Sequence, residues 1–229
     1  MIKLMVFDLD NTLAKIGKGI SIEDIILLRS IEKKGVRIAI CSGKPTYYLC
    51  GFMRQVELKD PILIGENGAV IQFGVDLPPR DYRILPYSDA AKETIVYLKD
   101  AFNALLPGLW YQPNLTGLTP FPSSQEEFDI IAGCMDRNQS QIHDVTVYRH
   151  VDSFDITPNG IDKFAGLAYL GELTGISREE TVAVGDGVND YPMFAYAGHA
   201  VGVCVADETK VHRNFTSSTE ALRYLLELL

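Results

Sequence analysis

The chain has 229 residues, of which 47% are hydrophobic and 22% charged, and its formal net charge is −9. This composition is ordinary for a globular protein, and the length allows one large or two small domains. An acidic chain lacks the basic surface that nucleic acids and anionic membranes require, so neither is expected as a partner. The sequence has no apolar run of about 18 residues and no apolar leader, so neither a membrane span nor a secretory signal is expected. The four cysteines are scattered and are expected to be buried and reduced. A cytoplasmic location is therefore expected.

Strands and helices are expected to alternate in the first third of the chain. Short apolar runs predict strands at 2–7, 36–41 and 62–64, with a hairpin strand at 69–73. Amphipathic segments between them predict helices over 21–35 and 45–56, and Ser21 precedes Asp24 at capping-box spacing. Strands that alternate with helices are typical of a parallel sheet with right-handed crossovers.

The pattern changes between residues 77 and 153. Helices are expected over 89–106 and 124–137 and strands at 145–148 and 154–157, with an aromatic, proline-rich segment at 110–122. Alternation then resumes, with a helix, strand, helix, strand and helix over 162–173, 181–184, 191–196, 200–205 and 220–229. The sequence therefore predicts an α/β fold, a doubly wound, Rossmann-like parallel sheet formed by residues 1–80 and 155–229, with a small α+β domain inserted at 81–154.

Four aspartates follow two of the predicted strands. Asp8 and Asp10 end the first strand, and Asp186 and Asp190 follow the strand at 181–184. Ligands of open parallel sheets bind beyond the carboxyl ends of the strands, so these side chains are expected to converge there. Carboxylates that close repel one another unless a cation neutralises them. Hard oxygen donors with no His or Cys nearby favour Mg²⁺ over zinc.

Hydrolysis of a phosphate monoester needs parts that this set supplies. Asp8 is a candidate nucleophile, and Asp10 is a candidate acid and base. Ser42 and the backbone at Gly43 can donate hydrogen bonds to phosphate, and Lys163 can offer a positive charge.

The motifs resemble those of the haloacid dehalogenase superfamily of phosphohydrolases. The matching segments are Asp8 to Leu13, Ser42-Gly43, Lys163 and Gly185 to Asp190, in this order and each near a predicted strand end. The resemblance implies Asp8 as nucleophile, Asp10 as acid/base, Ser42, Gly43, Lys163 and Asn189 at the phosphate, and Asp8, Asp10 (through its carbonyl), Asp186 and Asp190 at Mg²⁺. It also implies that the inserted domain is a cap that opens and closes.

The position of the insertion resembles the Cof-like branch, and its small size resembles archaeal-type phosphoglycolate phosphatases. Asn11 stands where many Cof-like chains have Gly, and Asn tolerates the backbone angles needed there. The expected partner is a small phosphorylated metabolite, with phosphoglycolate, a sugar phosphate and a cofactor phosphate all left open, as is the oligomeric state. A phosphosugar mutase and a non-catalytic binding module are the alternative functions. In the inserted domain, Trp110 is expected in the core, and contact with the leaving group of the substrate is the alternative.

Overall fold

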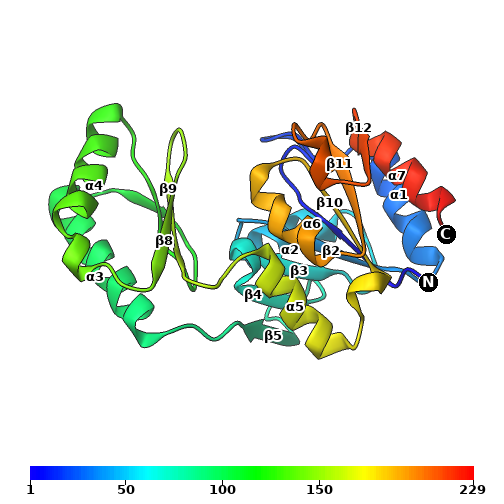
Figure 1. Cartoon of the computed structure of the whole chain (residues 1–229), viewed down its shortest axis with the longest axis horizontal. Coiled ribbons are helices and arrows are strands. Elements are labelled where there is room, and N and C mark those ends of the chain that lie inside the picture. The colour runs from blue at the N-terminus through cyan, green and yellow to red at the C-terminus, as the bar shows by residue number, and fades with distance from the viewer. The chain divides into compact units, whose positions relative to one another are not determined.

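The computed structural model describes residues 1–229, and the chain divides into two compact units. Unit 1 contains Met1–Leu85 and Asp162–Leu229, and unit 2 contains Pro86–Ile161, drawn mostly in green in Figure 1. Both boundaries lie a few residues later than those predicted after residues 80 and 154. Residues 81–84 form a strand of the sheet of unit 1, and residues 154–158 form a strand of unit 2.

The centre of unit 1 is a mixed eight-stranded sheet in the order β12-β11-β10-β1-β2-β3-β4-β5. The run from β12 to β3 is parallel, as predicted, whereas β4 and β5 are added as antiparallel strands. The edge strand β12 was not predicted. The strands are β1 (Leu4–Phe7), β2 (Arg37–Cys41), β3 (Ile62–Gly65), β4 (Val70–Phe73), β5 (Asp81–Ile84), β10 (Thr181–Gly185), β11 (His199–Val203) and β12 (Arg213–Phe215).

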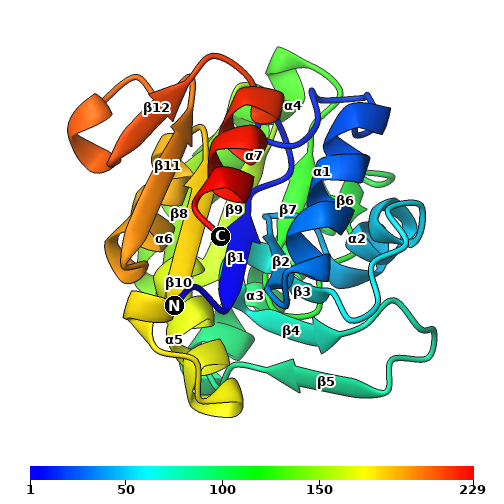
Figure 2. The ribbon, with the colours of Figure 1, turned by 90° about the vertical axis from the view of Figure 1, so that its right-hand side faces the viewer.

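Helices cover both faces of this sheet, which confirms the doubly wound prediction. On one face, the buried side chains of α1 (Ile22–Lys33), α2 (Thr46–Arg54) and α7 (Ser218–Glu227) join one apolar cluster with those of the central strands. α1 and α7 lie side by side there (Figure 2). The other face carries α5 (Lys163–Thr174) and α6 (Tyr191–Tyr196), which pack against each other. The apolar strands, covered on both sides, form the core.

A buried aspartate joins α1 to α7. Ser21 caps α1 by accepting a hydrogen bond from the Asp24 amide at 3.0 Å. The Asp24 carboxylate does not complete the expected capping box, because it accepts hydrogen bonds from the hydroxyls of Ser218 (2.7 Å) and Thr219 (2.6 Å). Asp24 therefore ties the first turn of α7 to the start of α1.

The chain reverses its direction across the sheet at β1. It first adds β2 and β3 on one side, and later β10, β11 and β12 on the other. Neighbouring crossovers leave on opposite faces at such a switch point, which opens a crevice beyond the carboxyl ends of β1 and β10. Asp8 and Asp186 are the residues that directly follow these two strands.

Unit 2 is the α+β domain that was expected. Its helices α3 (Asp89–Leu105) and α4 (Gln125–Arg137) cover the hairpin of β8 (Val145–Arg149) and β9 (Phe154–Pro158). The aromatic segment forms a second hairpin, β6 (Trp110–Gln112) and β7 (Thr119–Phe121), which was not predicted. A bridge between Leu118 and Ile156 joins the two hairpins. Trp110 was expected in the core but is 59% exposed, because it lies on the side of β6 away from the helices.

None of the helices combines the length and the apolar composition that crossing a membrane requires. The four cysteines form no disulfide. Cys41, Cys50 and Cys134 are buried, as expected, whereas Cys204, which directly follows β11, is exposed.

Candidate active site

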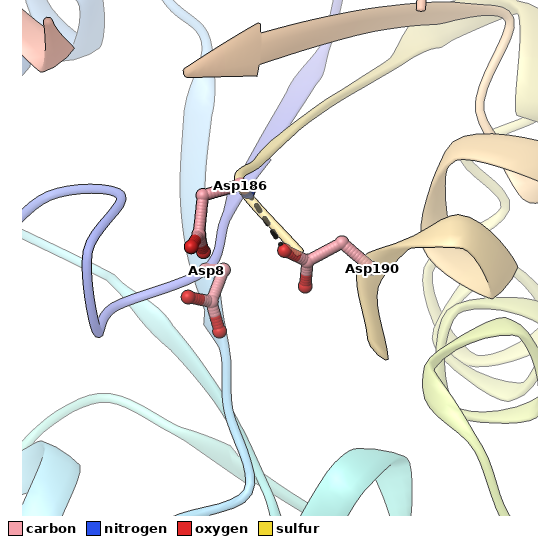
Figure 3. A group of neighbouring side chains, drawn as sticks. All are labelled: Asp8, Asp186 and Asp190. Atoms are coloured by element: carbon pink, nitrogen blue, oxygen red, sulfur yellow. Dashed lines mark hydrogen bonds between the residues drawn. The ribbon is translucent and has the colours of Figure 1, made fainter. Parts of the chain in front are cut away.

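Three aspartates meet at the carboxyl edge of β1 and β10. Asp8 follows β1, Asp186 follows β10, and Asp190 lies one turn later, at the start of α6. Figure 3 shows the carboxylates turned toward a common space, and an oxygen from each lies within 4.8 Å of the others. The structure thus brings together Asp8, Asp186 and Asp190 as the sequence predicted.

Lys163 lies against this acid cluster. Its Nζ is 2.7 Å from Oδ1 of Asp8 and 2.6 Å from Oδ1 of Asp190, and its side chain is 1% exposed. Although burial acts to lower the pKa of Lys163, the charges of Asp8 and Asp190 raise it well above its usual range. Lys163 is therefore a charged donor placed directly beside the candidate nucleophile.

Burial raises the pKa of two carboxyl groups of the acid cluster, those of Asp8 and Asp186. It raises the pKa of Asp8 to about 7, while Lys163 acts to lower the pKa and Asp190 to raise it further. Burial also raises the pKa of Asp186, and the charge of Asp190 adds to this effect. One ammonium group thus does not offset the whole negative charge of the acid cluster.

Asp190 accepts hydrogen bonds both from Lys163 and from the turn that contains Asp186. While Oδ1 accepts from Lys163, Oδ2 accepts hydrogen bonds from the amides of Asp186 (2.8 Å) and Gly187 (3.0 Å). A side chain at position 185 would collide with the Asp190 carboxylate, so Gly185 is required here. Asp190 therefore positions two neighbours in addition to any ligand role.

Thr12 is a site residue that the sequence analysis did not identify. Its hydroxyl donates a hydrogen bond to Oδ1 of Asp186 at 3.1 Å, and Thr12 is buried. Only its position within the motif Asp8 to Leu13 could have indicated from the sequence that Thr12 belongs to the site. The motif turns sharply at Asn11, whose φ of +63° lies in the left-handed region that Asn accepts more readily than most residues.

The Asp10 carboxylate lies outside the acid cluster. Its Oδ2 is 3.9 Å from Nζ of Lys44, and both side chains are partly exposed. Lys44 was also not identified from the sequence, although it directly follows the Ser42-Gly43 motif. The two carboxylates of Asp8 and Asp10 thus have different environments, one buried beside Lys163 and the other open to solvent.

Ser42 and Gly43 form a loop against Asn67, beyond β2 and β3. The buried Ser42 accepts a hydrogen bond on Oγ from the Lys44 amide at 3.2 Å, and its carbonyl accepts from the Asn67 amide at 3.0 Å. A Cβ at Gly43 would lie 3.3 Å from Oδ1 of Asn67, so the two residues are in close contact. Asn189, by contrast, is exposed in the turn after Asp186, with its amide beside Gly187.

The donor set of the acid cluster fits a hard divalent cation. The three ligand atoms of the cluster are carboxylate oxygens, which Mg²⁺ and Ca²⁺ prefer. Lys163 engages only one oxygen of Asp8, and Thr12 only one of Asp186. The acid cluster has three carboxylates against the single ammonium of Lys163. It therefore has both the free oxygens and the negative charge to hold such an ion.

The stability of the metal-free chain is expected to fall as pH rises. The pKa of Asp8 in the folded chain is about 7, above its reference value of 3.8. Protonation of Asp8 therefore stabilises the folded state relative to the unfolded state, and this stabilisation is lost as pH rises through about 7. A cation binds the ionised carboxylates, so the gain in melting temperature with excess Mg²⁺ over EDTA should increase between pH 5 and pH 8. An equal gain at both pH values would contradict a metal site at Asp8.

Close packing of the backbone of α5 against Gly68 fixes the position of α5, and therefore that of Lys163 at its start. A Cβ at Gly166 would lie 2.6 Å from Cα of Gly68, so Gly166→Ala must shift α5. We expect a loss of about 1–3 kcal/mol in unfolding free energy and at least a tenfold loss of activity, because Lys163 moves with its helix. Gly51→Ala is the control, since Gly51 lies in α2 with open space around its Cα and should gain about 0.5–1 kcal/mol. Urea unfolding and steady-state rates measure both variants, and equal behaviour would contradict this packing argument.

An open α/β sheet with acids at its switch point and an inserted α+β unit is the architecture of a known class of hydrolases. The family model described as haloacid dehalogenase-like hydrolase matches residues 5–112 and 114–216. The chain belongs to this family and is therefore an enzyme of the hydrolase class.

Curated relatives and solved structures agree with this assignment. A phosphoglycolate phosphatase of Staphylothermus marinus is 26% identical over 215 residues, which cover 90% of this chain and 87% of that protein. The crystal structure of a haloacid dehalogenase-like hydrolase from Bacteroides thetaiotaomicron matches with a TM-score of 0.79 at 20% identity, covering 98% of this chain and all of that one. A sugar phosphatase of subclass IIB of the superfamily matches with a TM-score of 0.72 at 20% identity, covering 97% of this chain and 98% of that one. At these identities the solved structures establish the fold.

Proposed function

We propose that the chain is a Mg²⁺-dependent phosphatase that hydrolyses a small phosphorylated metabolite through an aspartyl-phosphate intermediate. The observation that carries this proposal is the carboxylate of Asp8, buried at the switch point between Asp186, Asp190 and the ammonium group of Lys163. The family assignment and relatives named phosphoglycolate phosphatase support it.

Asp8 is the nucleophile of this proposal. One of its oxygens attacks phosphorus and the bond from phosphorus to the ester oxygen breaks, while Asp10 gives a proton to the departing alcohol. Asp10 then takes a proton from water, which attacks the phosphorus of the aspartyl phosphate and releases inorganic phosphate. The partly exposed position of Asp10 suits a group that must exchange protons with both the alcohol and water.

The remaining candidate residues hold the phosphoryl group and the ion. Ser42 and the amide of Gly43, Lys163 and Asn189 are the proposed phosphate contacts. Asp8, Asp186 and Asp190, with the carbonyl of Asp10, would hold Mg²⁺, which supplies positive charge against the repulsion between nucleophile and phosphate. Unit 2 is the proposed cap, which controls access of water and substrate.

A panel of phosphate esters tests the function. We expect inorganic phosphate to be released from at least one small ester in Mg²⁺ and not in EDTA. A phosphosugar mutase would instead convert a sugar phosphate to its isomer with little free phosphate. A chain that releases no phosphate and makes no isomer from any ester with Mg²⁺ would be the non-catalytic binding module.

A further inference from the structure

The turn between β3 and β4 holds three consecutive residues in the left-handed region of the backbone. We call Glu66–Gly68 the β3–β4 turn, and the φ angles of Glu66, Asn67 and Gly68 are +53°, +56° and +109°. Glycine adopts such angles freely, whereas other residues adopt them at a cost in free energy. Two such residues in succession therefore require neighbouring contacts that fix the turn.

One side of the turn is bonded to the loop that follows β2, residues 42–45, which we call the β2–α2 loop. The amide of Glu66 donates a hydrogen bond to the carbonyl of Lys44 at 3.1 Å, and the amide of Asn67 donates to the carbonyl of Ser42 at 3.0 Å. The side chain of Asn67 covers Gly43, because a Cβ at position 43 would lie 3.3 Å from Oδ1 and 3.4 Å from Nδ2 of Asn67. The β3–β4 turn thus contacts three successive residues of the β2–α2 loop.

The other side of the turn lies against the start of α5. A Cβ at Gly68 would overlap the carbonyl oxygen of Asp162, the residue that caps α5, and would lie 3.2 Å from Cα of Gly166. Lys163 is the first residue of α5, and its ammonium group contacts Asp8. The position of the β3–β4 turn therefore determines where Lys163 lies relative to the β2–α2 loop.

The proposed phosphate contacts come from these same two segments. Ser42 and Gly43 belong to the β2–α2 loop, whereas Lys163 belongs to α5. A phosphoryl group can bind both segments at once only if the spacing between them is fixed, and small misplacements of binding groups weaken their combined effect. The β3–β4 turn is packed against both segments and can therefore set this spacing.

We propose that Asn67 is a positioning residue for phosphate binding, which holds the β2–α2 loop at the spacing from Lys163 that a phosphoryl group requires. This inference rests on the proposed phosphatase function. Asn67 acts through two groups, since its main-chain amide fixes Ser42 and its side chain fills the space beside Gly43. Asn is one of the few residues other than Gly that accept left-handed angles, so it can supply a side chain at this position.

Asn67→Gly tests the side chain alone, because this variant keeps the left-handed angle and the main-chain amide. We expect the melting temperature to change by less than about 4 °C, since glycine adopts this angle without strain. With the space beside Gly43 open, the Kd of inorganic phosphate in Mg²⁺, measured by titration calorimetry, should rise by about fivefold or more. KM for a hydrolysed phosphate ester should rise with it, while kcat changes less, because the lost contribution already acts on the bound substrate.

Asn67→Ala separates the role of the side chain from the stability of the turn. Alanine tolerates the left-handed angle poorly, so this variant should melt at a lower temperature than Asn67→Gly. Both variants lack the amide group beside Gly43, so the phosphate Kd and KM should rise in both. A merely structural role would lower the folded fraction, and with it kcat, while KM stayed unchanged. A phosphate Kd that rises only in the less stable variant, or in neither variant, overturns the proposal.

Glu57→Gly is the matched control. Glu57 is exposed and also has a left-handed φ, +54°, but it follows the end of α2, whereas the β2–α2 loop precedes the start of α2. Its replacement should leave the phosphate Kd and KM within about twofold of the wild type. A wild-type chain that binds inorganic phosphate but releases none from any ester would reject the phosphatase function, and the Kd values of the variants would still decide the role of Asn67.

Discussion

Asp8→Asn is expected to abolish phosphate release while leaving the fold intact. An amide oxygen is a poor nucleophile and cannot form the aspartyl phosphate, so we expect kcat to fall by about 10³-fold or more. The substitution keeps the size of the side chain and removes a carboxyl group whose pKa is raised because burial disfavours its charged form. The metal-free variant should therefore unfold at a urea concentration no lower than that of the wild type. Phosphate release and urea unfolding measure the two effects.

Asp24→Asn is the matched control for this variant. Asp24 is also a buried aspartate, but its partners are the hydroxyls of Ser218 and Thr219, on α7. Its amide variant should lose about 1–3 kcal/mol of unfolding free energy and keep its kcat, since its hydrogen bonds serve the packing of two helices. Near-wild-type turnover by Asp8→Asn would remove Asp8 from the mechanism.

Lys163→Met is expected to be the most destabilising single change in the acid cluster. Removing the ammonium leaves Asp8 and Asp190 buried without their common partner, and breaking a buried ion pair costs about 3–5 kcal/mol. The loss should be greatest at pH 8 and smaller at pH 5, because Asp8, whose pKa is already raised, can take up a proton. Urea unfolding at both pH values measures this difference.

Lys44→Met is the control for the lysine variant. Lys44 lies 3.9 Å from Asp10, and both side chains are partly exposed, so its loss should change the unfolding free energy by less than about 1 kcal/mol. Excess Mg²⁺ should recover part of the stability of Lys163→Met at pH 8, since the ion replaces some of the missing positive charge. A Lys163→Met protein with wild-type stability at pH 8 would contradict a stabilising ion pair between Lys163 and the acid cluster.

The central strands and the acid cluster followed from local sequence because strong signals coincide there. β1 and β10 are buried apolar runs, each ending directly in an aspartate, so the strand assignment alone placed Asp8 and Asp186 at one sheet edge. Lys163 was a candidate for a positive charge at the phosphate, which the family resemblance strengthened, and the structure shows why a lysine is useful at that position. Its helix begins next to the acid cluster, and its ammonium group lies between two of the carboxylates.

Features that depend on distant partners could not be predicted from the sequence. The strand β5 consists of half-exposed residues, including Asp81 and Arg83, and its pairing depends on β4. The hydrogen bond from Thr12 to Asp186 joins residues 174 positions apart. Trp110 reads as a core residue from its size alone, and only its register opposite Phe121 shows that it faces away from the helices.

The most direct test is to locate the phosphoryl group during turnover. The chain, mixed with Mg²⁺ and a phosphate ester that it hydrolyses, is quenched in acid within one turnover, reduced with borohydride and mapped by mass spectrometry. Borohydride converts an aspartyl phosphate to homoserine, so the account predicts homoserine at position 8 and only there. Reduction at another residue, or rapid phosphate release with residue 8 unmodified at every quench time, would contradict it.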